Sequence, residues 1–96
     1  MDFKVTFSEN ALKEIEAIQQ FIGEDDPERA RRVCDKLFEK AIGLNLFPYR
    51  HALCPHRDNV RKVPVSPYLI YYRINEHKRR VTILHFWHGA RQHPML

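Results

Sequence analysis

Basic and imidazole side chains gather in the last third of the chain, between Asn59 and Arg91, where they could bind an anionic partner. Three β-rich runs, VRKVPV, YLIYYRI and VTILHFWH, follow one another there. Successive side chains of a strand point to opposite faces, so each run can give one face to a core and leave the other for cations and aromatic rings. The positions expected on the open face are Arg61, Lys62, Arg73, Lys78, Arg79, Arg80, His85, His88 and Arg91.

Three arginines are the best individual candidates for binding: Arg61, Arg73 and Arg91. A guanidinium group binds phosphate or carboxylate with two parallel hydrogen bonds, which suits nucleic acid, a protein surface or an acidic peptide. Lys62 adds a further charge beside the first of them. The alternative is that Arg73 and Arg91 pair with Asp or Glu side chains of the helices and only hold the fold.

Aromatic side chains accompany these cations at Tyr68, Tyr71 and Tyr72. Tyrosine rings can stack on nucleobases or receive the apolar side chains of a protein partner. The alternative is cross-strand packing within the sheet, and at least one of the three is expected in the core. Trp87 is expected there as well, because its bulk suits the seam between sheet and helices.

Two histidines of the last run, His85 and His88, could act as general acid or base because imidazole titrates near neutral pH. Their spacing places them on opposite faces of the strand. If the protein cleaves RNA without a metal, the catalytic set would be Arg61, Arg73, His88 and Arg91, in which the cations stabilise the phosphorane. A protein that acts by binding needs no catalytic residue, so these residues leave both interpretations open.

The run from His51 through Cys54 to His56 has the side chains of a metal site, but only half of one. Zinc takes three or four protein ligands, often from paired knuckles, and the other cysteine, Cys34, falls in a helical pattern. No metal is therefore predicted. The chain also has no Gly-rich phosphate loop, no serine nucleophile elbow and no carboxylate pair in its basic half, so no cofactor is expected.

Charge divides the chain into two halves. Residues 1–48 hold seven Lys/Arg and ten Asp/Glu, whereas residues 49–96 hold nine Lys/Arg, two Asp/Glu and all six histidines. An acidic half joined to a basic half indicates an anionic partner such as nucleic acid or an acidic protein segment. An ordinary solvated surface is the alternative.

Composition predicts one globular domain, which spans residues 1–96, with 44% hydrophobic and 29% charged residues. No apolar run approaches the ~20 residues that cross a bilayer, and the amino terminus lacks the basic and apolar regions of a secretory signal. Two cysteines do not make a disulfide framework. A cytoplasmic protein without membrane contact is expected.

Hydrophobic periodicity predicts the elements that position these residues. FKVTF at 3–7 alternates as a strand, Ser8 caps a helix that ends at Gly23, and Asp26-Pro27 opens a second helix that ends before Pro48. Gly23 is expected to end its helix in the left-handed region. The apolar stripes of the two helices are Leu12, Ile15, Ile18 and Ile22, then Ala30, Val33, Leu37, Ala41 and Leu44.

The short link between the helices predicts an antiparallel hairpin. With the three later strands the order is β-α-α-β-β-β, which predicts an α+β fold with the helical hairpin packed on one face of a mainly antiparallel sheet. In either register of the sheet, aromatic side chains are expected to be exposed on the opposite face. That face carries either Leu69, Tyr71 and Arg73, or Tyr68, Ile70 and Tyr72.

The residues VRKVPVSPYLIYYRI followed by VTILHFWHGAR resemble the carboxy-terminal signature of the RelE/ParE superfamily of bacterial toxins. FSENALKEIEAI, Pro-Glu-Arg-Ala at the start of the second helix and Leu-Phe-Pro at its end agree with the same pattern, so the similarity covers nearly the whole chain. Its most specific parts are residues 68–73 and 88–91, and the subgroup is ParE-like. The chain departs from the pattern at Gly89, because several ribonuclease toxins have Tyr after the His at this point.

The resemblance implies the toxin of a bacterial type II toxin–antitoxin module, with a role in plasmid stabilisation. Its implied partners are a co-encoded ParD-like antitoxin in a hetero-oligomer, DNA gyrase as the target, and operator DNA reached only through the antitoxin. Two alternatives stay open: a ribosome-dependent mRNA endonuclease of the RelE type, and a non-toxic relic that still binds the antitoxin. The residues expected to bind the target or the antitoxin are Arg61, Lys62, Tyr68, Tyr71, Tyr72, Arg73, His88 and Arg91.

Overall fold

The computed structural model describes residues 2–92 and 94 of the 96-residue chain. The predicted order of one strand, two helices and three strands is confirmed, with two short 3₁₀ turns after the second helix. No helix in this described part is both long and apolar enough to cross a membrane. The elements are β1 (Lys4–Phe7), α1 (Glu9–Gly23), α2 (Pro27–Ile42), η1 (Gly43–Asn45), η2 (Pro48–Arg50), β2 (Val60–Val65), β3 (Tyr68–Asn75) and β4 (Arg80–His88).

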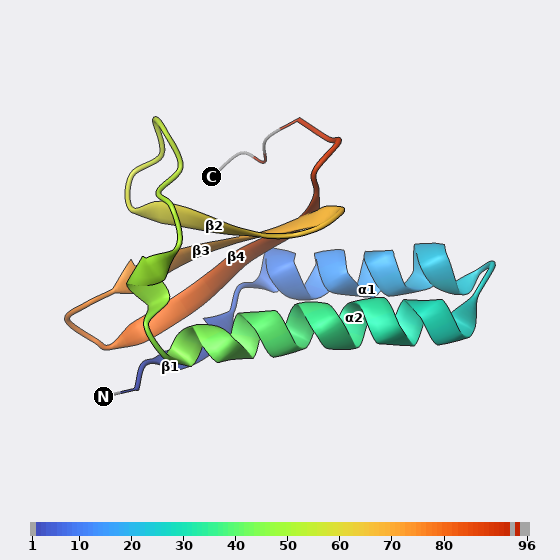
Figure 1. The fold of residues 1–96 in the computed structure, drawn as a ribbon, viewed down its shortest axis with the longest axis horizontal. Coiled ribbons are helices and arrows are strands. Elements are labelled where there is room, and N and C mark those ends of the chain that lie inside the picture. Colours follow the sequence, from blue (N-terminus) through green and yellow to red (C-terminus); the bar gives the residue numbers. More distant parts are fainter. Residues whose placement is uncertain (1, 93, 95–96) are drawn as a thin grey trace.

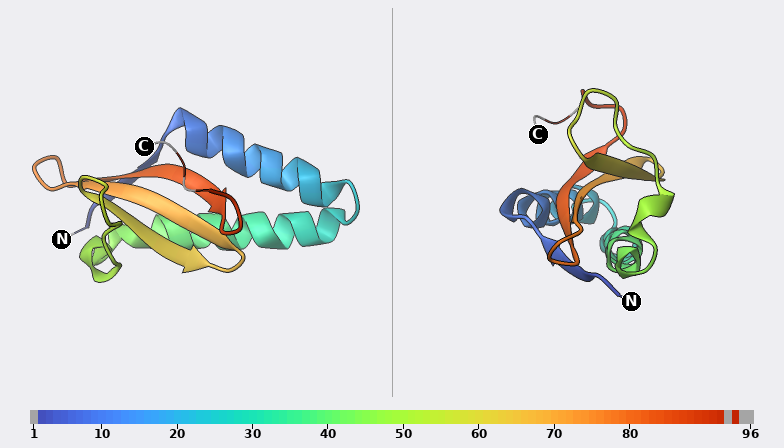
Figure 2. Two further views of the ribbon diagram at one scale, coloured as in Figure 1. Left: turned by 90° about the horizontal axis from the view of Figure 1, so that it is seen from above. Right: turned by 90° about the vertical axis from the view of Figure 1, so that its left-hand side faces the viewer.

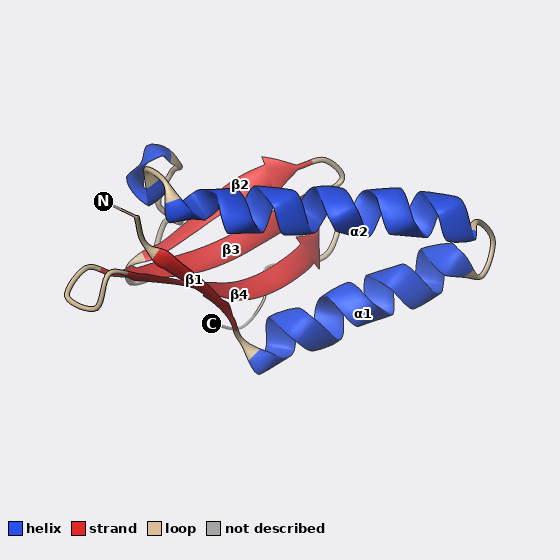
Figure 3. Ribbon diagram, turned by 90° about the horizontal axis from the view of Figure 1, so that it is seen from below, coloured by secondary structure: helices blue, strands red, loops and turns tan. Residues whose placement is uncertain are grey.

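The four strands form one sheet in the order β1-β4-β3-β2. β1 is parallel to β4, whereas β4 with β3 and β3 with β2 are antiparallel. The α1–α2 hairpin covers one face of this sheet (Figure 1), and a view from the helical side shows α2 in front of the strands with α1 alongside it (Figure 3). The prediction of a helical hairpin on a mainly antiparallel sheet is therefore confirmed.

Side-chain caps fix where both helices begin. Ser8 Oγ accepts from the Ala11 N–H at 3.0 Å, and Asp26 Oδ1 accepts from the Arg29 N–H at 3.1 Å. Each bond satisfies one of the free donors of a first helical turn. The predicted end of the first helix at Gly23 is confirmed, but the expected left-handed conformation there is wrong, because Gly23 has no positive φ and Glu24 is still right-handed.

The core lies between the helices and the sheet face that they cover, which we call the inner face. Its strand residues include Tyr68, Ile70, Tyr72 and Ile74 of β3, and they pack with the buried side of both helices. The predicted stripe of α1 is wrong at Leu12, which is 49% exposed. Ala11 is the buried residue of that turn instead, because its neighbour lies about 100° further around the helix.

The hydroxyl of Tyr72 links the sheet to the turn that follows the helices. This side chain is fully buried and donates to the Pro48 carbonyl at 2.6 Å, and burial raises the pKa of its hydroxyl to about 12. Tyr72→Phe would leave that carbonyl buried without its donor. We expect the free energy of unfolding to fall by about 1–2 kcal/mol in urea denaturation. Tyr49→Phe is the matched control, because Tyr49 is exposed, and equal losses in both variants would contradict a role for the buried bond.

Candidate functional site

The sheet face turned away from the helices, here called the outer face, carries most of the predicted binding residues. Cross-strand pairing places Lys62, Tyr71 and His85 in one row, and Leu69 with Trp87 in the next. Residues 52–59 rise beside this face at one end of the sheet and the carboxy-terminal segment rises at the other (Figures 1 and 2). Of the two registers left open by the sequence, the one with Leu69, Tyr71 and Arg73 outward is therefore correct.

A bulge in β4 decides which side chains reach the outer face. Tyr71 pairs with His85 but Tyr72 pairs with Ile83, so Leu84 is an extra residue on β4. One extra residue reverses the alternation of everything that follows it. Trp87 consequently lies half-buried on the outer face, and its predicted place in the core between sheet and helices is wrong.

All three predicted binding tyrosines are buried, so the expectation of exposed rings is wrong. Tyr68 and Tyr72 face the helices, and the ring of Tyr68 packs edge-on against His88 at 5.3 Å. Tyr71 does face outward, but it is only 2% exposed because it packs against Cys54 of the loop above it. The alternative of cross-strand packing fits Tyr68 with His88 and Tyr71 with His85, whereas the ring of Tyr72 packs edge-on to His51.

Arg61 does not lie on the open face as expected. It pairs with Tyr72 in the inner-face register, and its Nη1 donates to the carbonyls of Tyr49 at 3.1 Å and His51 at 2.6 Å. Its guanidinium also lies over the Tyr49 ring, 5.3 Å from the centroid. Arg61 therefore holds the segment 49–51 against the sheet, which is a structural role.

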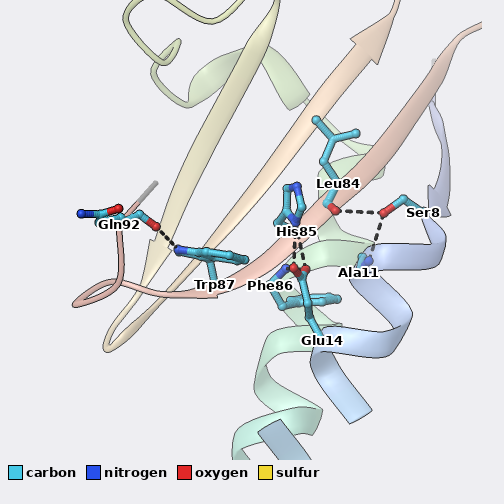
Figure 4. A network of polar contacts seen from close by, with 8 residues as sticks. All are labelled: Ser8, Ala11, Glu14, Leu84, His85, Phe86, Trp87 and Gln92. Atoms are coloured by element: carbon cyan, nitrogen blue, oxygen red, sulfur yellow. Dashed lines mark hydrogen bonds and ion pairs between the residues drawn. The ribbon is translucent and has the colours of Figure 1, made fainter. Parts of the chain in front are cut away.

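His85 is also not exposed as expected: it is 7% exposed and pairs with a helix carboxylate. Its Nδ1 lies 2.8 and 3.1 Å from the two oxygens of Glu14, and Glu14 Oε1 also accepts from the Phe86 N–H at 3.1 Å (Figure 4). Glu14 lies off the apolar stripe predicted for the first helix, and no local sequence pattern indicates this contact. His85 is thus bound to α1 and is not placed as a general acid or base for a ligand.

The reason for this pairing is the shortness of β1. The strand β1 pairs with β4 only as far as Ile83, so the edge of β4 beyond it needs other partners. Ser8 Oγ donates to the Leu84 carbonyl at 2.9 Å, and Glu14 bonds the Phe86 N–H (Figure 4). The start of α1 therefore completes the hydrogen bonding of the strand edge that β1 leaves open.

Of the four Lys and Arg side chains predicted to bind the target or the antitoxin, three remain available: Lys62, Arg73 and Arg91. Arg73 and Arg91 are exposed and Lys62 is half-buried. Throughout residues 2–92 and 94 none of the three pairs with a carboxylate, because every ion pair lies on a helix or joins His85 to α1. The alternative that Arg73 and Arg91 are held by helix carboxylates is therefore wrong.

Arg91 and His88 lie at a groove between α1 and the end of the sheet, here called the α1 groove. It has a volume of about 400 Å³ and a largely apolar wall. The Arg91 guanidinium stacks on Trp87 at 4.1 Å from the ring centroid, and His88 Nδ1 accepts from the Ala90 N–H at 3.1 Å. The groove is lined by Glu14, Ala17, Ile18, Phe21, Tyr68, Phe86, His88 and Arg91.

The four residues proposed for a nuclease do not converge. Arg61 is in the inner-face register and Arg73 is on the outer face. His88 pairs with Tyr68, five positions along β3 from Arg73, which corresponds to about 16 Å along the strand. A proton donor and the phosphate-binding cations must reach the same bond, and of the four residues only His88 and Arg91 share a site.

His51, Cys54 and His56, which resemble half of a zinc site in the sequence, have different surroundings in the structure. Cys54 is buried, whereas His51 packs edge-on to Tyr72 and its Nε2 accepts from Arg50 Nε at 3.3 Å. Burial first, and then the charges of Arg50 and Lys40, lower the pKa of His51. Among the described residues no three His, Cys, Asp or Glu side chains are grouped as metal ligands.

The element order, the helical hairpin and the mixed four-stranded sheet define a small α+β protein with the fold of RelE/ParE toxins. The family of ParE toxins of type II toxin–antitoxin systems (parDE) matches residues 5–93. This match covers most of the sequence, so the chain belongs to that family.

Solved structures agree with this assignment at the level of the fold. A chain of the chromosomal ParDE toxin–antitoxin system from P. aeruginosa is similar at TM-score 0.78 and 18% identity, over 90% of this chain and 95% of that one. A chain of the RelBE2 complex from Mycobacterium tuberculosis gives 0.70 and 22% identity over 95% of both chains. A chain of the intact RelBE complex from E. coli gives 0.67 and 19% identity, over 93% and 99%. No curated protein sequence matches the chain.

Proposed function

We propose that this toxin inhibits DNA gyrase by binding it, and that a co-encoded ParD-like antitoxin neutralises the toxin. Membership of the ParE family supports this function, since the resemblance to ParE toxins implies binding to gyrase without cleavage of RNA. The observation that carries the proposal is the set of available cations, Lys62, Arg73 and Arg91, none of which has a carboxylate partner in the described part of the chain. Such cations favour an acidic or phosphate-bearing partner.

Binding is favoured over catalysis because one candidate histidine is paired with a carboxylate and the other lies apart from two of the three candidate cations. His85 pairs with Glu14, and His88 lies about 16 Å along the strand from Arg73 on the other face of the sheet. A general acid or base has to lie within hydrogen-bonding reach of its substrate together with the groups that stabilise charge. His88 shares the α1 groove with Arg91, but Arg61 and Arg73, the other cations of the catalytic set, do not line that groove.

The α1 groove is the surface that fits the antitoxin. Ile18 and Phe21 of α1 give it an apolar wall, and His88 with Arg91 gives it a basic rim. An acidic amphipathic segment could order itself there, with apolar side chains in the groove and carboxylates at Arg91. Contact with operator DNA would then be made by the antitoxin within the hetero-oligomer.

A reconstituted gyrase assay tests the proposed target. Purified toxin, gyrase, ATP and supercoiled DNA should yield trapped cleavage complexes, and antitoxin added beforehand should prevent them. Unchanged supercoiling at a large excess of toxin would remove gyrase as the target. Primer extension on translated messages in toxin-expressing cells would then reveal codon-positioned cuts if the toxin were a nuclease. Normal growth after induction would identify a non-toxic relic.

Arg73→Ala and Arg91→Ala should each weaken toxicity about tenfold, because each removes a charged donor to the partner. Toxicity is measured as the toxin concentration that halves gyrase activity, or as the induction level that arrests growth. Both side chains are exposed, so the melting temperature should hardly change. Lys13→Ala is the control, since Lys13 is an exposed cation on α1 that pairs with Glu9. Equal losses for all three variants would show that toxicity follows stability and not this surface.

A further inference from the structure

A loop folds onto the outer face and makes a second hollow there, distinct from the α1 groove. The Cys54 N–H donates to the Val60 carbonyl at 2.7 Å, and the Lys62 N–H donates to the Ala52 carbonyl at 3.1 Å. These bonds pair residues 52–54 with β2, so the loop is held close to the sheet. Figure 1 shows this loop rising beside β2 on the side away from the helices.

The tip of the loop turns back toward the sheet. His56 has a left-handed backbone with φ 63°, and the Arg57 N–H donates to the Cys54 carbonyl at 3.3 Å. The tight turn returns Arg57 to a half-buried position where it lines the same hollow as Lys62, although the two are five residues apart in sequence. Two cations of different elements are thereby brought to one hollow.

This hollow, which we call the loop pocket, has a volume of about 420 Å³. No carboxylate lines it, and neither Arg57 nor Lys62 has an ion-pair partner in the described part of the chain. Like charges held together without a counter-charge repel each other, and an anion between them relieves that repulsion. The pocket is lined by Cys54, Pro55, His56, Arg57, Lys62 and Tyr71.

The uncharged groups of the pocket are also suited to an anion. Burial raises the pKa of the Cys54 thiol, against the opposing charges of Lys62 and Arg57. Burial and the neighbouring Cys54 likewise raise the pKa of the Tyr71 hydroxyl, and Arg57 opposes them. Both groups therefore stay protonated near neutral pH, so neither adds negative charge that would repel an anion.

We propose that the loop pocket is a binding site for a phosphate group, which is held by the guanidinium of Arg57 and the ammonium of Lys62. His56 forms the open side of the pocket and Tyr71 its floor. The phosphate can belong to a nucleic-acid backbone or to a small phosphorylated compound, because both present the same oxyanion. The inference concerns the isolated chain and does not depend on gyrase as the target.

A residue-resolved NMR titration of the full chain tests the site. Inorganic phosphate, added at constant ionic strength against chloride, should cause saturable shifts of the amide resonances of Cys54, His56, Arg57 and Lys62. Arg57→Gln and Lys62→Gln should each raise the dissociation constant about tenfold, as expected for one lost charge-assisted contact. Lys78→Gln is the control, because Lys78 is an exposed cation that does not line the pocket.

A parallel titration with a short DNA duplex identifies the source of the phosphate. The same amide shifts at a much lower concentration than inorganic phosphate would support the pocket and assign a nucleic-acid backbone. Shifts with inorganic phosphate alone would support the pocket and assign a small compound. The proposal is overturned if neither ligand gives saturable shifts there, if the shifts are equal at the exposed Lys78 and Arg80, or if both pocket variants bind phosphate as the unmodified chain does. Unchanged spectra elsewhere in each variant show that the fold is intact.

Discussion

Glu14→Ala is expected to lower the free energy of unfolding by about 2–3 kcal/mol, although Glu14 belongs to the polar side of a surface helix. The carboxylate accepts from His85 and from the Phe86 N–H on the open edge of β4. Alanine would leave both donors without a partner, and His85 would remain buried. An unsatisfied buried donor costs about 1–3 kcal/mol, and partial solvent access to Glu14 keeps the sum at the lower end.

Urea denaturation of three variants measures this effect. Glu14→Gln keeps one carbonyl oxygen for the Phe86 N–H and should recover part of the loss. Glu16→Ala removes an exposed carboxylate from the same helix and should change stability by less than about 0.5 kcal/mol. If Glu14→Ala were as stable as Glu16→Ala, the carboxylate would not be holding the edge of β4.

The same contact has a consequence for the outer face. The His85 ring packs edge-on with Trp87 at 5.5 Å and with Tyr71 at 6.5 Å. Glu14 therefore positions, through His85, the aromatic floor on which Arg91 stacks and above which the loop lies. Loss of Glu14 should loosen this surface before it unfolds the helical hairpin, because the hairpin keeps its own apolar contacts.

The helices and strands could be predicted from the sequence because their signals, the capping residues and the alternation of apolar residues, lie within each element. The Ser8 cap, the Asp26-Pro27 start of the second helix and the alternating runs of the last three strands depend on neighbours a few residues away. The exposure of Arg73 and Arg91 also followed from such patterns. Arg73 follows the alternation of β3, and Arg91 lies in the turn that follows β4.

The predictions that were wrong concern side chains whose exposure depends on contacts between residues far apart in the sequence. The bulge at Leu84 reverses the faces of Trp87 and its neighbours, and strict alternation contains no sign of it. The burial of Tyr71 depends on a loop that returns to the sheet through a left-handed turn at His56. Arg57 was missed for the same reason, because only the folded loop brings it to the same hollow as Lys62.

Phe21→Ala is expected to weaken antitoxin binding about 30-fold, with little change in the stability of the free toxin. Phe21 is 76% exposed on α1 and forms part of the apolar wall of the α1 groove. A large apolar side chain that is solvated in the free toxin and buried by its partner contributes its transfer free energy to binding alone. Truncation at such a position typically costs about 2 kcal/mol of binding free energy.

Leu12→Ala provides the matched control, because Leu12 is an exposed apolar residue of the same helix that does not line the groove. Isothermal titration of the co-encoded antitoxin into each purified variant gives the two dissociation constants, and melting curves confirm that both variants are folded. Arg91→Ala in the same titration should weaken binding less at high salt than at low salt, because the exposed charge at the rim is screened. Equal affinity for the Phe21 and Leu12 variants would mean that the antitoxin covers another face of the toxin. The outer face, with its available cations, would then be the next candidate for the antitoxin site.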